Sequence, residues 1–193
     1  MDLYSRRLDA AIALATDAFR ARPRKGTGIP YLSHLLQVLV TVAEHGGDED
    51  QQIAAVLHDY LEDIPGATAD ELRERFGEQV AQLVVGLSDA TSQPKPPWEE
   101  RKRAYLQHLC DAPAELKLIS AADKLHNAQS LRRDFALVGD SLWSRFSASR
   151  AQTLWYYREV VQALGTGWEH RLWSELHAEV RRLHEAVGES LPL

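Results

Sequence analysis

The sequence predicts an all-α protein, and two observations carry this prediction. Apolar residues recur at helical spacing along nearly the whole chain, for example at Leu8, Ala11, Ile12, Ala15 and Phe19. Sustained alternation of apolar and polar residues, which indicates half-buried strands, is absent. The chain has 193 residues and neither an internal repeat nor a break in composition. We therefore expect a single domain over residues 1–193.

Prolines, glycines and capping residues divide the N-terminal half into helices. The first helix is expected over about residues 2–21, because the segment 22–30 holds two prolines and two glycines and must be a loop. In Thr68-Ala69-Asp70-Glu71, a hydroxyl is followed three residues later by a carboxylate, the pattern of a capping box at a helix start. The remaining helices of this half are expected over about residues 31–46, 48–59, 68–76 and 78–88.

The C-terminal half is also expected to be helical. The stretch 91–97 contains three prolines and predicts an irregular surface loop, after which helices resume at Trp98. Pro113 suits the first turn of a helix, so a long helix is expected from there to about residue 135. A turn at Gly139-Asp140 and two further helices complete the chain.

Charge and composition exclude several classes of function. The net charge of −6 argues against a sequence-independent DNA-binding protein, which needs a broad basic surface. No apolar run approaches the roughly 20 residues of a membrane helix, so no membrane partner is expected. The single cysteine, Cys110, cannot form an internal disulfide and fits a reducing compartment. We expect a cytoplasmic protein without a nucleic-acid partner, and the sequence leaves the oligomeric state open.

A cluster of ionisable residues ends the apolar run of the third helix. His58-Asp59 is followed by Glu62-Asp63, and on a continuous helix these residues lie on one side. Three carboxylates so close repel one another, and burying them without compensation costs several kcal/mol. Either this helix end is solvated, or a cation neutralises it.

Two distant residues favour the cation. His34 lies in an amphipathic stretch, and Asp123 ends the apolar run 118–122, so each places a metal-ligand side chain beside the core. Alone, His34 would be read as a hydrogen-bonded core histidine and Asp123 as a cap or ion-pair partner. With His58 and Asp59 they supply two imidazoles and two carboxylates, a donor set that suits Mn²⁺, Fe²⁺ or Zn²⁺.

With His34, His58-Asp59 and Asp123, the chain resembles the HD-domain metal phosphohydrolases, whose pattern is an early His, a His-Asp pair and a late Asp. The similarity is greatest to the hydrolase domain of RelA/SpoT-type proteins and to the small alarmone hydrolases, over about residues 20–165. It rests on Arg24-Lys25-Gly26, on Pro30-Tyr31-Leu32-Ser33-His34, on His58-Asp59-Tyr60-Leu61-Glu62-Asp63 and on Asp123-Lys124-Leu125-His126-Asn127. Leu35 and Tyr60 depart from the family's usual residues.

The resemblance implies an HD-domain helical bundle with a metal site between its central helices. It implies removal of the 3′-pyrophosphate from guanosine tetra- or pentaphosphate, the alarmone of the stringent response, to return GDP or GTP. The metal ligands would be His34, His58, Asp59 and Asp123, holding Mn²⁺ or another divalent cation. Glu62 and Asp63 would be catalytic residues that orient the attacking water and accept its proton.

The resemblance also places two basic segments around a small-molecule nucleotide. Arg24 and Lys25 would lie at the guanine base, and Arg101 and Lys102 at the phosphates. Asn127 would bind the ribose or support a metal ligand. For each segment the alternative is a solvated run of charge, and for Asn127 an amide on the helix surface.

Two other functions remain open. One is an HD phosphohydrolase acting on a different nucleotide, such as a deoxynucleotide, a cyclic nucleotide or a 3′-phosphorylated dinucleotide cofactor, with identical ligands. The other is a non-catalytic module that binds a nucleotide. Because all four metal-ligand positions and both catalytic carboxylate positions hold the residue types that the family uses, the sequence favours an enzyme.

Overall fold

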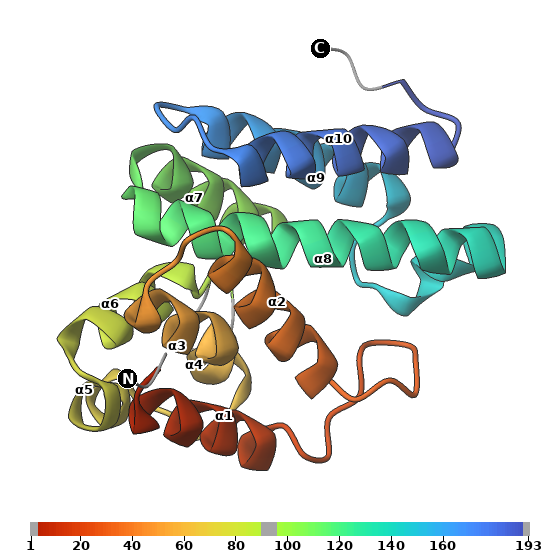
Figure 1. Ribbon diagram of the computed structural model, residues 1–193. Coiled ribbons are helices and arrows are strands. Elements are labelled where there is room, and N and C mark those ends of the chain that lie inside the picture. The colour runs from red at the N-terminus through yellow and green to blue at the C-terminus, as the bar shows by residue number, and fades with distance from the viewer. Residues whose placement is uncertain (1–3, 90–95, 191–193) are drawn as a thin grey trace. The chain divides into compact units, whose positions relative to one another are not determined.

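The computed structural model describes residues 4–89 and 96–190, and the described chain is built of helices (Figure 1). The described residues contain no strand, only an isolated bridge between Pro23 and Pro30. The all-α prediction is confirmed. The chain forms two compact units, one comprising residues 1–96 and 113–120 and the other residues 97–112 and 121–193.

The first unit contains the N-terminal helices and the start of α8. Its core is apolar, with the run Ile53–Leu57 fully buried, each large side chain contributing roughly 1.5–3 kcal/mol. Within this unit α3 packs against α1, α2 and α6, so it is the central helix. The helices are α1 (Arg6–Ala18), α2 (Leu32–Glu44), α3 (Glu49–Leu57), α4 (Tyr60–Asp63), α5 (Ala69–Phe76) and α6 (Glu78–Leu87).

Local caps explain where these helices begin. Ser5 caps α1 through its side chain, so the helix starts later than residue 2. Asp48 and Gln51 form a reciprocal capping box at α3. Thr68 caps α5 as predicted, by accepting from the amide of Glu71. The Glu71 carboxylate accepts from the Tyr60 hydroxyl at 3.1 Å, which links α5 to α4.

The expected continuous helix through residues 58–63 is interrupted. α3 ends at Leu57 and α4 begins at Tyr60. His58 Nδ1 bonds to the carbonyl oxygen of Ala55 at 2.8 Å, an oxygen that a continuing helix would offer to the amide of Asp59. The angular spacing of an ideal helix therefore does not apply between His58 and Glu62.

The second unit is built from the remaining helices. α9 packs against both α7 and α10. The predicted long helix and the two C-terminal helices are present, and the turn at Gly139-Asp140 opens a short 3₁₀ helix. The predicted loop 91–97 lies largely outside the described residues. The elements are α7 (Trp98–Asp111), α8 (Ala114–Val138, whose first turns belong to the first unit), η1 (Gly139–Arg145), α9 (Arg150–Gly165) and α10 (Arg171–Ala186).

Across residues 4–89 and 96–190, none of the helices combines the length and the apolar character that crossing a bilayer requires.

Candidate metal centre

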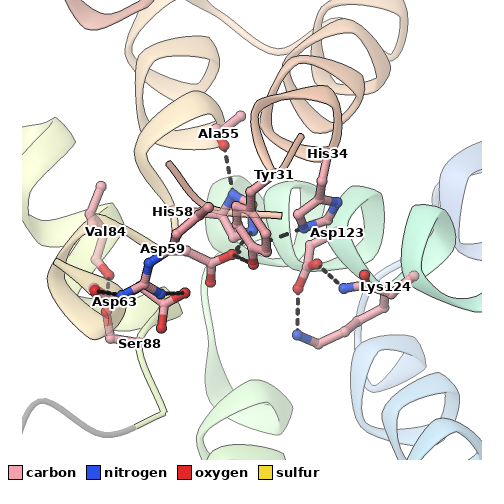
Figure 2. A network of polar contacts seen from close by, with 12 residues as sticks. Tyr31, His34, Ala55, His58, Asp59, Asp63, Val84, Ser88, Asp123 and Lys124 are labelled. Carbon is pink, nitrogen blue, oxygen red and sulfur yellow. Dashed lines mark hydrogen bonds and ion pairs between the residues drawn. The ribbon is translucent and has the colours of Figure 1, made fainter. Parts of the chain in front are cut away.

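His34, His58 and Asp59 meet inside the first unit. One ligand atom from each lies within 4.8 Å of the other two (Figure 2). His34 comes from the first turn of α2, while His58 and Asp59 form the junction between α3 and α4. Both histidines are buried, and the Asp59 side chain is about one-fifth exposed. The packing of α2 against α3 thus brings together residues 24 or more positions apart.

The orientation of the His58 ring reveals the character of its second nitrogen. A carbonyl oxygen only accepts hydrogen bonds, so Nδ1, which faces the Ala55 carbonyl at 2.8 Å, carries a proton. In the neutral ring Nε2 then presents a lone pair. This Nε2 lies 3.0 Å from Oδ2 of Asp59, which is also an acceptor. Two acceptors at that distance repel each other unless a proton or a metal ion is shared between them.

His34 completes a donor set that fits a divalent cation. Its Nε2 lies 4.0 Å from the same oxygen of Asp59, and the two imidazole rings meet edge to face with centroids 5.1 Å apart. Two imidazole nitrogens and one carboxylate oxygen, without thiolate, match the ligands of Zn²⁺, Fe²⁺ and Mn²⁺ sites. A bond from the histidine ring to a backbone carbonyl, as in His58, is the usual second contact of a metal-binding imidazole.

The predicted catalytic carboxylates, Glu62 and Asp63, lie on α4, one turn beyond His58 and Asp59. Both are partly buried. Asp63 pairs with Arg22, whose Nη1 lies 2.8 Å from Oδ2 and whose Nη2 also donates to the Asp63 carbonyl. Arg22 thereby holds the Asp63 carboxylate in one orientation.

Asp123 belongs to the second unit, where two donors hold its carboxylate. Lys124 Nζ lies 2.5 Å from one oxygen, and the amide of Asn127 donates to the other, also at 2.5 Å. Burial alone would lower the pKa of Lys124, but the Asp123 carboxylate raises it well above its ordinary value. The Lys124 ammonium also lies over the ring of Tyr105, 5.3 Å from its centroid. Two donors from its own helix thus fix the Asp123 carboxylate.

The predicted substrate-binding cations come from both units. Arg24 is partly buried, with its guanidinium 5.9 Å from the centroid of the Tyr31 ring, while Lys25 is exposed in the loop between α1 and α2. In the second unit, Arg101 and Lys102 lie on α7, and Lys102 Nζ is 4.9 Å from the centroid of the Tyr156 ring. Asn127 contacts Asp123, as described above.

Sequence reasoning missed three supporting residues. Tyr31 donates its hydroxyl to Asp59, Arg22 binds Asp63, and Lys124 binds Asp123. Only Lys124 had a sequence signal, since it directly follows its partner. Arg22 and Asp63 lie 41 positions apart, and their contact depends on how the loop between α1 and α2 packs against α4.

A family model described as HD domain matches residues 11–154. The chain is 35% identical over 131 residues to the guanosine-3′,5′-bis(diphosphate) 3′-pyrophosphohydrolase MESH1 of Danio rerio, covering 64% of this chain and 71% of that protein. It is 36% identical to the guanosine-3′,5′-bis(diphosphate) 3′-pyrophosphohydrolase of Aquifex aeolicus, over 66% of this chain but 18% of that longer protein.

The chain also matches a solved structure described by the words "A metazoan ortholog of SpoT hydrolyzes ppGpp and plays a role in starvation responses". The TM-score is 0.78 at 25% identity, and the match covers 94% of this chain and 97% of the other. The two named relatives thus share sequence with this chain, and the solved structure shares its fold.

Proposed function

Because the chain belongs to the HD-domain family, we propose that it is a metal-dependent phosphohydrolase that removes the 3′-pyrophosphate of guanosine tetra- or pentaphosphate. The products are pyrophosphate and GDP or GTP. The observation that carries the proposal is the 3.0 Å approach of His58 Nε2 to Asp59 Oδ2, beside the buried His34. The relatives named as 3′-pyrophosphohydrolases support the choice of substrate.

In this proposal the metal ligands are His34, His58, Asp59 and Asp123, and the ion is Mn²⁺. The first three already lie within reach of one ion. The carboxylate of Asp123 is held ready by Lys124 and Asn127, and the match of the HD model to residues 11–154 takes in both compact units. When bound, such an ion supplies Lewis-acid activation of a phosphoryl oxygen and of the attacking water.

Glu62 and Asp63 are proposed to orient the attacking water and to accept its proton. Water adds to the phosphorus attached to the 3′ oxygen, the bond between that phosphorus and the 3′ oxygen breaks, and the 3′ hydroxyl takes up a proton. The pairing of Asp63 with Arg22 keeps that carboxylate directed, which supports a role in orienting the attacking water.

The substrate carries several negative charges, whereas the protein has a net charge of −6, so binding needs local cations. We assign this role to Arg24 and Lys25 at the base and to Arg101 and Lys102 at the phosphates. The bond between Asn127 and Asp123 favours support of the metal ligand over a contact with the ribose.

Residues 1–193 then act as one catalytic domain on a small-molecule nucleotide in the cytoplasm. The single cysteine supports a reducing compartment, and the net charge of −6 argues against a nucleic-acid partner.

Product analysis tests the function. Purified protein with Mn²⁺ is incubated with guanosine tetraphosphate, and the products are separated by anion exchange. We expect GDP and pyrophosphate in equal amounts, inhibition by EDTA, and recovery with added Mn²⁺. Release of orthophosphate, or faster turnover of a deoxynucleotide or a 3′-phosphorylated dinucleotide cofactor, would refute the proposed substrate. Tight nucleotide binding without turnover would show a binding module instead.

The matched variant is Asp59→Ala, which removes one of the three clustered ligands. It should lose bound metal and turnover together while keeping its helical content. Full activity in this variant would refute the assignment of the site.

A further inference from the structure

Tyr31 stands at the junction between the candidate metal ligands and the basic loop. Its hydroxyl donates to Oδ2 of Asp59 at 2.5 Å, the oxygen that lies 3.0 Å from His58 Nε2. A hydroxyl bonded to a carboxylate at this distance is a charge-assisted hydrogen bond, stronger than a neutral one. The bond fixes the rotation of the Asp59 carboxylate toward the imidazoles.

The Tyr31 ring is itself held from several sides. It stacks on Phe19 with centroids 5.3 Å apart and planes 15° from parallel, and it meets the edge of His34 at 5.5 Å. Because Phe19 is buried in the core of the first unit, the stacked ring has a fixed support. The hydroxyl is therefore directed at Asp59 before any ion arrives, and little side-chain entropy remains to be lost.

Backbone contacts fix the same residue to the loop. The amide of Tyr31 donates to the Arg22 carbonyl at 2.8 Å, and the amide of Arg24 donates to the Ile29 carbonyl at 2.7 Å. These two bonds close the loop at its base, and the Arg24 guanidinium then lies over the Tyr31 ring. Tyr31 thus has a defined position relative to both the loop and Asp59.

From these contacts we infer that Tyr31 is a positioning residue that sets the affinity of the site for its divalent cation by orienting Asp59. This inference rests on the proposed metal-dependent function. Partners that hold a metal-ligating side chain contribute about tenfold to hundredfold to metal affinity. The Tyr31 hydroxyl is such a partner, and the His58 contact with the Ala55 carbonyl is its counterpart on the imidazole.

The variant Tyr31→Phe tests the inference because it removes only the hydroxyl and keeps the ring contacts. Protein stripped with EDTA is titrated with Mn²⁺, and free Mn²⁺ is followed by electron paramagnetic resonance. We expect the Kd for Mn²⁺ to rise about tenfold to hundredfold. With guanosine tetraphosphate, the apparent kcat should fall at limiting Mn²⁺ and recover at excess Mn²⁺, with KM for the nucleotide unchanged.

The matched control is Tyr60→Phe. Tyr60 directly follows Asp59, but its hydroxyl binds Glu71 instead. This variant should keep the Mn²⁺ affinity and the activity of the parent protein. The inference is overturned if Tyr31→Phe binds Mn²⁺ within twofold of the parent, or if Tyr60→Phe weakens binding equally.

The titration separates this inference from the proposed function. If the parent protein binds Mn²⁺ and Tyr31→Phe binds it more weakly, Tyr31 has the inferred role even where guanosine tetraphosphate is not hydrolysed. If the parent hydrolyses the nucleotide but both proteins bind Mn²⁺ equally, the function stands and the role of Tyr31 is refuted.

Discussion

The turn between α2 and α3 sets how α2, which carries His34, lies against α3, which His58 directly follows, and Gly47 is the most crowded glycine of this turn. A Cβ atom on Gly47 would lie 2.4 Å from Cγ1 of Val42, 3.0 Å from the Val42 carbonyl oxygen and 3.2 Å from Cδ2 of Leu118. Val42 is fully buried and β-branched, so its side chain has little freedom to move away. The carbonyl oxygen accepts from the Gly47 amide at 2.9 Å and is fixed as well.

Two effects of opposite sign decide the outcome of Gly47→Ala. Overpacking of this kind costs about 1–3 kcal/mol. Reduced entropy of the unfolded chain returns about 0.4–1 kcal/mol. The midpoints of these two ranges leave a net loss of about 1.3 kcal/mol, which corresponds to a fall in Tm of roughly 3–5 °C for a chain of this size.

The assay is thermal unfolding followed by circular dichroism, with Gly28→Ala as the control. Gly28 has no atom within 4 Å of the position its Cβ would take, so this variant should be neutral or slightly more stable. A Tm for Gly47→Ala equal to or above that of the parent would refute the reasoning, because it would show that Val42 yields without cost.

Three further predictions concern pH, catalysis and metal binding. Burial lowers the pKa of His184, so the unfolded chain takes up a proton at a higher pH than the folded chain. The free energy of unfolding should therefore fall as the pH drops below about 6.5, and it should fall less steeply in His184→Leu. Urea titrations at several pH values measure both. Arg22→Leu removes the partner of the Asp63 carboxylate and should lower kcat about tenfold with little change in KM. Steady-state kinetics measure both constants, and a change in KM alone would contradict this prediction. Asn127→Ala removes a donor to Asp123 and should weaken Mn²⁺ binding about tenfold by titration, so unaltered affinity would count against that support.

The helices were predictable because periodic apolar residues and local breakers determine them. Capping residues set the starts of α3 and α5 within a residue or two. The first helix was predicted too long, because Ser5 caps it and it ends at Ala18 instead of near residue 21. The break at His58 was not predictable from spacing, since it accompanies a bond from the His58 side chain to the carbonyl of Ala55.

The candidate ligands were predictable as residue types, while their supporting contacts were not. The burial of His34 and His58 follows from their place beside apolar runs, and the pairing of α2 with α3 brings them together. The bond from Tyr31 to Asp59 spans 28 positions and depends on side-chain packing, which no local pattern encodes. The pairing of Arg22 with Asp63 joins residues 41 positions apart and likewise had no signal in the sequence.

The position of a bound manganese ion tests the proposed metal centre most directly. Crystals of the protein soaked in Mn²⁺ should give one anomalous difference peak within about 2.3 Å of His34 Nε2, His58 Nε2 and carboxylate oxygens of Asp59 and Asp123. A peak that lies away from these four side chains, or fully loaded crystals in which Asp123 makes no contact with the ion, would contradict it.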